Sequence, residues 1–254
     1  MLAQERYEII LTMLHQHKVV KVTELCELFS VSIETVRRDL EHLESMGKLQ
    51  RIYGGAMLKI PTSHEPIYHA REDKNKQEKQ RIGAAAAALI EDHETIILDL
   101  GTTTLEVARH LKDKQDLTIL TNHLEIAQEL VDVESFRVIV IGGQLRRHEL
   151  SMSGYMAESF INEFNVDKAV IGVGGINLDH GISDYHLEEA RIRQHMLKRA
   201  EKVIAVADHS KFDVKALVNV CSIEQIDVLV TDVDPDQKYS RFLKDKKVRL
   251  VIAP

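Results

Sequence analysis

Short apolar runs alternate with helical segments from about residue 78 onward, and this alternation constrains the fold more than any other feature of the sequence. The runs 95–100, 117–122 and 137–143 are almost continuously apolar, as strands are when both faces of a sheet are covered. The segment 105–111, between two of these runs, has helical periodicity. Because strand and helix alternate at the spacing of βαβ units, we expect residues 78–254 to form an α/β domain with a mainly parallel sheet.

The chain begins with two amphipathic helical segments. Residues 2–17 have apolar side chains at helical spacing. Thr23 can cap a short helix that runs to Phe29, with Leu25 and Leu28 facing inward. The break after Phe29 is short, which is typical of a helix-turn-helix.

A third helix and a hairpin follow. The helix over 33–46 has one apolar stripe, made of Ile33, Val36, Leu40 and Leu43, and Gly47 ends it. Two short strands flank the turn at Gly54 and Gly55. Three helices and a hairpin predict a winged helix-turn-helix DNA-binding domain over residues 1–58.

Residues 59–77 have a different composition from both neighbours. Pro61 and Pro66 lie here among polar and charged residues, and no periodicity is visible. We expect this segment to be a linker between the two domains.

The exposed side of the third helix carries candidate DNA contacts. In a helix-turn-helix, the N-terminal turns of the second helix enter the major groove, which selects Ser32, Thr35, Arg37 and Arg38. In the hairpin, Arg51 and Tyr53 can reach a neighbouring groove or the DNA backbone. Glu34 and Arg38 also have the spacing of an ordinary surface ion pair. The order of helix, break, paired arginines and Gly-Gly turn favours the DNA-binding interpretation.

Polar residues and glycines follow several of the predicted strands. These strand ends share one edge of an open parallel sheet, where such folds bind ligands. The first of them opens a helix whose free backbone N–H groups and hydroxyls can hold a phosphate, although threonines at this point also cap helices. The candidate effector-binding residues at these strand ends are Asp99, Gly101, Thr102, Thr103, Thr104, Asn122, Gly142, Gly143, Gly174 and Gly175.

Three charged residues can complete this site. Lys211 follows a predicted strand and can reach the same edge as a cation for phosphate, or it can face solvent. Asp184 and Glu188 can accept hydrogen bonds from sugar hydroxyls, or they can be acids at the start of a helix. Arg146 and Arg147 can serve the ligand or face solvent, and the sequence leaves both alternatives open.

The overall composition excludes several classes of protein. A formal net charge of −7 means that DNA binding must come from a local basic surface, doubled by self-association. Cys26 and Cys221 are expected to be reduced core thiols, and the 13 histidines show no metal-binding spacing, so we expect no metal and no cofactor. No segment has the length and hydropathy of a membrane helix or the pattern of a signal peptide, so we expect a cytoplasmic protein.

The motifs together resemble the DeoR (deoxyribose operon repressor) family over almost the whole chain. The most distinctive are TVRRDL at 35–40, Arg-x-x-Gly-Gly-Ala at 51–56, DLGTTT at 99–104 and ADHSKF at 207–212. The resemblance implies a repressor of a sugar-catabolic operon that binds double-stranded operator DNA as a dimer or tetramer. It also implies a second domain similar to ribose-5-phosphate isomerase, which binds a phosphorylated sugar that lowers DNA affinity. The acid Glu34, in the groove-facing turn, can tune or oppose base contacts.

Two alternatives to a sugar-responsive regulator remain open. A sugar-phosphate isomerase needs a positioned base, but the turn at 172–177 that resembles the isomerase loop has no acid, and Glu188 is the remaining possible base. We therefore expect a regulator and not an enzyme. Alternatively, the α/β domain serves only for oligomerisation, which predicts that no sugar phosphate stabilises the protein.

Overall fold

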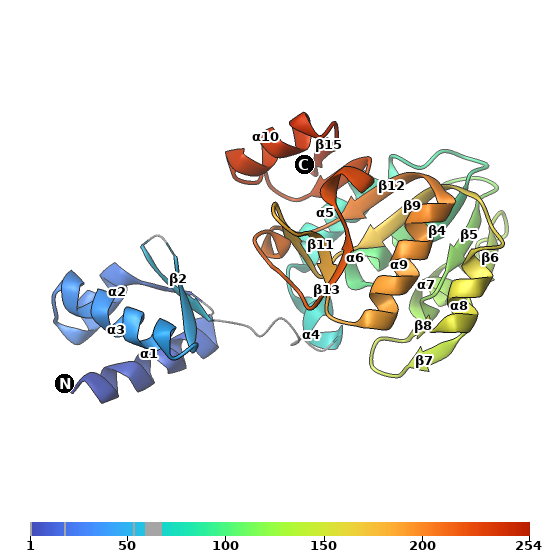
Figure 1. Cartoon of the computed structure of the whole chain (residues 1–254). Helices are drawn as coiled ribbons and strands as arrows, with labels where there is room; N and C mark the ends of the chain where they lie inside the picture. The colour runs from blue at the N-terminus through green and yellow to red at the C-terminus, as the bar shows by residue number, and fades with distance from the viewer. Residues whose placement is uncertain (1, 18, 53, 59–67) are drawn as a thin grey trace. The chain divides into compact units, whose positions relative to one another are not determined.

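The computed structural model describes residues 2–17, 19–52, 54–58 and 68–254. The chain divides into two compact units, residues 1–61 and 62–254, which are described separately (Figure 1).

The first unit is a winged helix-turn-helix, as predicted. Its helices are α1 (Ala3–His17), α2 (Val22–Phe29) and α3 (Ile33–Ser45). Its antiparallel sheet has the order β1-β3-β2, with β1 at Val19–Lys21, β2 at Leu49–Ile52 and β3 at Gly55–Leu58. The hairpin of β2 and β3 was predicted, whereas β1 was not, because three residues are too short to show a period. The prediction of Thr23 as a cap was wrong: α2 begins at Val22, after Lys21.

The buried side of α3 is rotated slightly around the helix axis from the predicted apolar stripe. The buried residues of α3 are Val36, Asp39, Leu40 and Leu43. Ile33 is 51% exposed because it lies about 70° from the centre of this buried side, at 100° per residue. Leu28 of α2, also predicted to face inward, is 54% exposed, while Leu25 and Phe29 are buried.

The second unit is built on a seven-stranded sheet, and all its neighbouring strands are parallel. In spatial order the strands are β15 (Arg249–Ile252), β14 (Val228–Thr231), β12 (Ala200–Val206), β9 (Val166–Gly172), β4 (Thr95–Leu98), β5 (Thr118–Thr121) and β6 (Arg137–Val140). The prediction of an α/β domain with a parallel sheet is confirmed.

Helices cover both faces of this sheet, and each face has its own hydrophobic core. On one face, Ile96, Leu98 and Val170 pack with apolar residues of α5 (Lys76–Ala87), α6 (Thr102–Arg109) and α7 (Leu124–Leu130). On the other, Ile97 and Ile171 pack with residues of α8 (Tyr155–Ile161), α9 (Leu187–Arg199) and α10 (Gln237–Asp245). Successive strand residues therefore enter opposite cores, which explains the continuous apolar runs.

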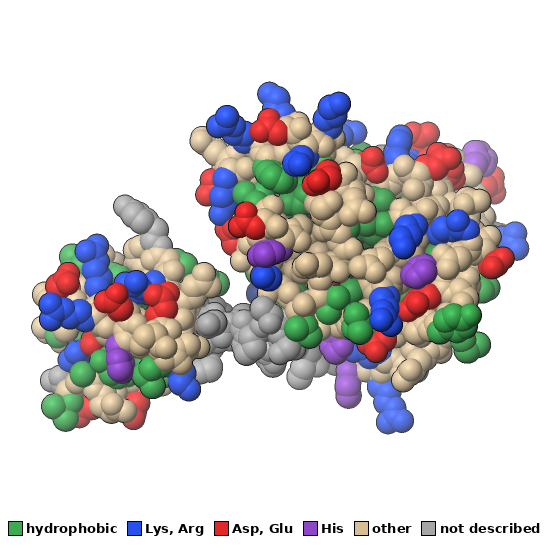
Figure 2. All heavy atoms as spheres, in the orientation of Figure 1, with side chains coloured by type: hydrophobic (Ala, Val, Ile, Leu, Met, Phe, Trp, Pro, Cys, Tyr) green, Lys and Arg blue, Asp and Glu red, His purple; other side chains and the backbone are tan. Residues whose placement is uncertain are grey.

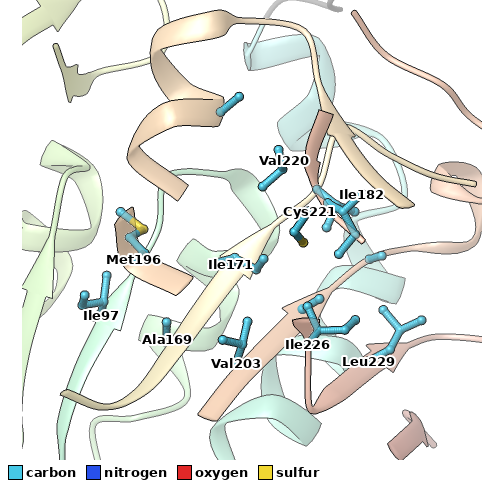
Figure 3. Close-up of a cluster of buried hydrophobic side chains, with 14 of the residues drawn as sticks. Ile97, Ala169, Ile171, Ile182, Met196, Val203, Val220, Cys221, Ile226 and Leu229 are labelled. Atoms are coloured by element: carbon cyan, nitrogen blue, oxygen red, sulfur yellow. The ribbon is translucent and has the colours of Figure 1, made fainter. Parts of the chain in front are cut away.

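Shorter elements surround the second core. An antiparallel sheet of β10 (Gly175–Asn177), β11 (Gly181–Asp184) and β13 (Val218–Cys221) contributes Ile182, Val220 and Cys221 to it (Figure 3). A separate hairpin joins β7 (Gln144–Arg146) to β8 (Ser151–Ser153). Two 3₁₀ turns lie at His209–Lys211 and Ile223–Gln225.

The segment expected to be a linker contains folded structure. Helix α4 (Tyr68–Asp73) and the start of α5 lie within residues 59–77 and belong to the second unit. The side chain of Tyr68 is buried. The prediction missed this helix because α4 is too short to show helical periodicity.

Among the described residues, no helix is long and apolar enough to cross a membrane. The described part of the chain also contains no cluster of metal-ligating side chains.

Candidate DNA-binding surface and ligand pocket

The start of α3 presents the predicted DNA-contacting side chains. Ser32 caps the helix: its hydroxyl accepts a hydrogen bond from the Thr35 N–H at 3.2 Å and lies 2.9 Å from the Thr35 hydroxyl. Arg37 and Arg38 are exposed. These positions suit contacts with DNA, which remain a prediction for all four residues.

The alternative ion pair between Glu34 and Arg38 is present but weak. The two side chains lie 3.9 Å apart and are 68% and 78% exposed, respectively. A pair of this kind contributes about 0.3–0.5 kcal/mol, which is small beside a contact with phosphate. Breaking the ion pair with Glu34 therefore costs little free energy when Arg38 contacts DNA.

The wing, which is the hairpin of β2 and β3, is anchored to α3 by Arg51. Its guanidinium donates to Glu44 at 2.7 Å and lies 3.8 Å from Glu41. Its backbone N–H also donates to Glu44. A groove between α3 and the wing is lined by Arg37 and Arg51 among others. Tyr53, the other predicted wing contact, lies outside the described residues.

A buried ion pair fixes the position of α3 on α1. Arg6 donates two hydrogen bonds to Asp39, from Nε at 2.6 Å and from Nη2 at 2.9 Å. The pair is almost wholly buried, with 8% of Arg6 and 4% of Asp39 exposed. Figure 2 shows basic and acidic side chains interspersed on the displayed face of this unit.

In the second unit, a pocket opens at the carboxyl ends of β4, β9 and β12. The strands after β4 extend to one side of it, through β5 and β6, and those after β9 extend to the other, through β12 and β14. The pocket therefore lies at the topological switch point of the sheet, where open α/β folds bind ligands. Its volume is about 70 Å³. Six of the predicted effector residues line it: Gly101, Thr102, Thr103, Gly174, Asp184 and Lys211.

One wall of the pocket is the start of α6. Gly101 precedes the helix with φ +141, a conformation that favours glycine, and the first N–H groups of an α-helix have no partner within the helix. Thr102 and Thr103 line the wall. Thr104 is fully buried, and its hydroxyl donates to the Gly101 carbonyl at 2.8 Å. Of the three threonines, two face the pocket and the third stabilises the turn.

The floor is a buried ionic triad centred on Arg193. Its guanidinium donates to Asp99 at 2.5 Å and also to Asp184. Asp99 accepts a further bond from the Gly172 N–H at 3.1 Å, and burial raises its pKa to about 6 despite the facing arginine. Burial alone would raise the pKa of Asp184 as well, but Arg193 and the His186 N–H hold that pKa below its usual value.

The rim of the pocket is cationic. Lys79 is 5% exposed and donates to the Arg71 carbonyl, and burial lowers its pKa to about 8. Burial also lowers the pKa of Lys211, although Asp208 opposes this effect. Lys74 lines the rim and is exposed.

Several residues of the pocket were not predicted: Arg71, Lys74, Lys79, Arg193, Asp208 and Ser210. Arg71, Lys74 and part of α5 lie in or beside the segment expected to be a linker. Arg193 is in the middle of α9, and its buried position could have been inferred only from its place on the apolar side of that helix.

The other predicted effector residues lie outside the lining of this pocket. Asn122 is buried and supports the loop after β4, since its carbonyl oxygen accepts from the Leu100 N–H at 3.1 Å. Gly142 and Gly143 follow β6, two strands from β4. Asp99 lies beneath the pocket. The two remaining residues are Gly175, in β10, and Glu188, in α9.

Glu188 is exposed, and the adjacent Glu189 is the acid that faces inward. Glu189 accepts from Arg146 at 2.8 Å and from the Ser151 hydroxyl at 3.1 Å. Of the two arginines left open by the sequence, Arg146 is therefore held in a buried network, and Arg147 is exposed.

A winged helix-turn-helix followed by a parallel α/β unit with a cationic pocket is the architecture of a transcriptional regulator. Comparison with known proteins agrees with this class. Residues 6–62 match the DeoR-like helix-turn-helix domain, and residues 74–233 match the DeoR C terminal sensor domain. The chain belongs to the DeoR family of transcriptional regulators. The expectation of a regulator and not an enzyme is confirmed by this membership.

Relatives of known function match over nearly their full length. The chain is 37% identical over 254 residues to the HTH-type transcriptional repressor GlcR of Bacillus subtilis (strain 168), covering 99% of this chain and 97% of that protein. It is 34% identical over 246 residues to the glycerol-3-phosphate regulon repressor of Escherichia coli (strain K12), covering 97% of each. Among solved structures, ribose 5-phosphate isomerase A from Methanocaldococcus jannaschii matches with a TM-score of 0.41 and 17% identity over 56% of each chain.

Proposed function

We propose that this protein represses a carbohydrate-catabolic operon and that a phosphorylated sugar, bound in the pocket of the second unit, lowers its affinity for operator DNA. The observation that carries this proposal is the charge of the pocket. Two of the relatives are named as repressors, and one of these names refers to a phosphorylated polyol, glycerol 3-phosphate, which supports both the sign of regulation and the ligand class.

The charges around the pocket favour a ligand with one phosphoryl group. Five cations line it: Arg71, Lys74, Lys79, Arg193 and Lys211. Four carboxylates oppose them, namely Asp184 and Asp208 in the lining and Asp99 and Glu149 paired with lining arginines. One positive charge is left over, to which the start of α6 adds roughly half a charge. A phosphomonoester carries about −1.5 to −2 at pH 7, so one such group neutralises this excess, whereas a bisphosphate exceeds it.

The shape of the pocket supports a small, hydroxylated ligand. Its volume of about 70 Å³ is small, which favours a phosphoryl group on a small polyol over a ligand as large as a dinucleotide. The phosphate is assigned to the start of α6 with Lys79 and Lys211, because helix N-termini bind anions. Asp184, Asp208 and Ser210 can accept hydrogen bonds from sugar hydroxyls.

We also propose that the protein acts as a dimer or tetramer on double-stranded DNA. Each chain has one α3, and helix-turn-helix proteins read two half-sites with paired helices. Tyr155 and Met156 on α8 are 82% and 74% exposed, as expected of side chains that an oligomer covers.

A thermal-shift screen tests the ligand class. The panel contains phosphorylated sugars, the same sugars without phosphate, and sugar bisphosphates, and the best ligand is then added to a gel-shift assay with the neighbouring promoter. We expect monophosphates alone to stabilise the protein and to release DNA. Stabilisation by the unphosphorylated sugars, or by no compound of the panel, would contradict the proposal.

Variants separate the two sites. Lys211→Ala and Thr103→Val are expected to lose the ligand and keep operator DNA, and Arg38→Ala is expected to do the reverse. Lys202→Ala is a matched control, because Lys202 is exposed near the start of β12, at the opposite edge of the sheet. Loss of both activities in every folded variant would show that the two sites do not act as separate modules.

A further inference from the structure

Helix α4 is the first described element of the second unit, and it follows residues 59–67 along the chain. It has only six residues, which is too short for a helix to be stable by itself in water. Its position must therefore depend on contacts with the rest of the unit. Those contacts come mainly from Tyr68 and Arg71.

Tyr68 attaches the first turn of α4 to α7. Its side chain is 1% exposed, its hydroxyl donates to Glu125 at 2.5 Å, and its ring centroid lies 5.5 Å from that of His123. The guanidinium of Arg71 lies 5.6 Å from the centre of the same ring, within the range of a cation–π contact.

Arg71 attaches the other end of α4 and also lines the pocket. Its guanidinium pairs with Glu149, a 2% exposed acid in the connection between β7 and β8. The backbone carbonyl of Glu149 is in turn 3.0 Å from Nε2 of His123. The carbonyl of Arg71 accepts a hydrogen bond from Lys79, a second cation of the pocket. The contacts of Arg71 with Glu149 and with Lys79 both hold α4 in place, and both involve a cation that lines the pocket.

We propose that Arg71 transmits occupancy of the pocket to α4, an inference that rests on the proposed function. Without a ligand, Glu149 holds the guanidinium of Arg71. A phosphoryl group in the pocket competes with Glu149 for Arg71 and draws the ammonium group of Lys79 away from the Arg71 carbonyl. Binding therefore weakens the attachment of α4, the first described element that follows the DNA-binding unit along the chain.

This mechanism satisfies the thermodynamic condition for coupling. A ligand shifts an equilibrium only if it binds the two states with different affinities. Here the difference is that Arg71 and Lys79 are occupied by protein partners in one state and available to the ligand in the other. If ligand binding favours the loosened state of α4 by some factor, loosening α4 must favour ligand binding by the same factor. Coupling factors of this kind are typically about 5–150-fold.

Hydrogen exchange of the full chain, with inorganic phosphate as the probe, tests the proposal. In the wild-type protein, phosphate should increase exchange of the α4 amides while it protects the start of α6. Glu149→Gln keeps the shape of the side chain and removes the charge that holds Arg71. This variant should show fast α4 exchange without phosphate, at least about fivefold tighter phosphate binding, and weaker operator binding.

A second variant and a control keep the test independent of folding. Tyr68→Phe retains the buried ring and loses the bond to Glu125, so it should shift α4 exchange and phosphate affinity in the same direction by a smaller amount. Ala70→Ser changes an exposed position of the same helix and should behave as wild type. If Glu149→Gln fails to fold, Tyr68→Phe decides the question.

The outcomes separate the two hypotheses. Phosphate binding to the wild-type protein with unchanged α4 exchange, or with no gain of affinity in either folded variant, overturns the coupling through Arg71 and leaves the pocket as the ligand site. Failure of phosphate and of every phosphorylated sugar to bind the wild-type protein overturns the proposed function, and the coupling with it.

Discussion

The buried ammonium group of Lys79 predicts that the affinity for a phosphorylated ligand falls as pH rises from 7 to 9. Burial is the main cause of its lowered pKa of about 8, with Lys211, Arg71 and Lys74 acting in the same direction and Asp208 against it. At pH 7 about 90% of Lys79 is protonated, and at pH 9 about 10%. A bound phosphate dianion favours the protonated form and raises its pKa.

The sign and size of the effect follow from these protonation states. Because Lys79 has a higher pKa in the complex than in the free protein, binding takes up a proton and weakens above the pKa of the free protein. The fall from pH 7 to 9 is about tenfold for this residue alone. The ligand itself does not change charge in this interval, since the second pKa of a phosphomonoester is about 6. Burial also lowers the pKa of Lys211, which adds to the fall in the same direction.

Calorimetric titration at pH 7, 8 and 9 and constant ionic strength measures this dependence with the best ligand of the screen. Lys79→Met removes one titrating cation, so the advantage of the wild-type protein over the variant should shrink about tenfold between pH 7 and 9. Lys202→Met, an exposed lysine at the other edge of the sheet, serves as control. An advantage that stays constant over this interval would refute the assignment of Lys79 to the phosphate.

Three further predictions concern the first unit. Asp39→Ala should lower the free energy of unfolding by about 3–5 kcal/mol in urea, because it leaves Arg6 without its buried carboxylate; a loss below 1 kcal/mol would contradict this role. Gly55→Ala should cost about 1–3 kcal/mol by the same assay, since a Cβ there would lie 2.1 Å from the Val20 carbonyl oxygen; an unchanged free energy of unfolding would contradict this close approach. Glu34→Gln should strengthen operator binding by up to about twofold in a gel shift, because it frees a neighbouring arginine from a pair worth about 0.5 kcal/mol at most; weaker binding would indicate a direct contact of Glu34 with DNA.

The sequence predicted those features that depend on periodicity. The continuous apolar runs predicted a parallel sheet because each strand has a core on both faces, and the spacing of Val36, Leu40 and Leu43 predicted the buried side of α3. Asp39 was not expected in that side, because a buried acid is compatible with a core only when a partner such as Arg6 faces it. Arg6 lies 33 residues away along the chain, so this pairing depends on the tertiary structure and leaves no local pattern in the sequence.

The pocket was predicted only in part, for a related reason. Residues that follow strands can be recognised in the sequence, because a parallel sheet brings them to one edge. This reasoning correctly placed the loop after β4, Asp184 and Lys211 at the pocket. Arg71 and Lys79 come from the short helix α4 and the start of α5, where no pattern indicates which side chain turns inward. The ligand-facing cations that matter most for coupling were therefore those with the weakest local signal.

The pairing of β4 with β9 has a consequence for the order of events during synthesis and folding. Ile96 pairs with Lys168, so this seam joins segments separated by a long stretch of chain, and closing it is a slow, non-local step. The pocket takes one wall from each side of the seam, from the loop after β4 and from the loop after β9. An emerging chain thus has its complete DNA-reading unit before it has any site for a ligand. During that interval the DNA-binding unit can fold, while the pocket that we propose to bind a phosphorylated sugar is still incomplete.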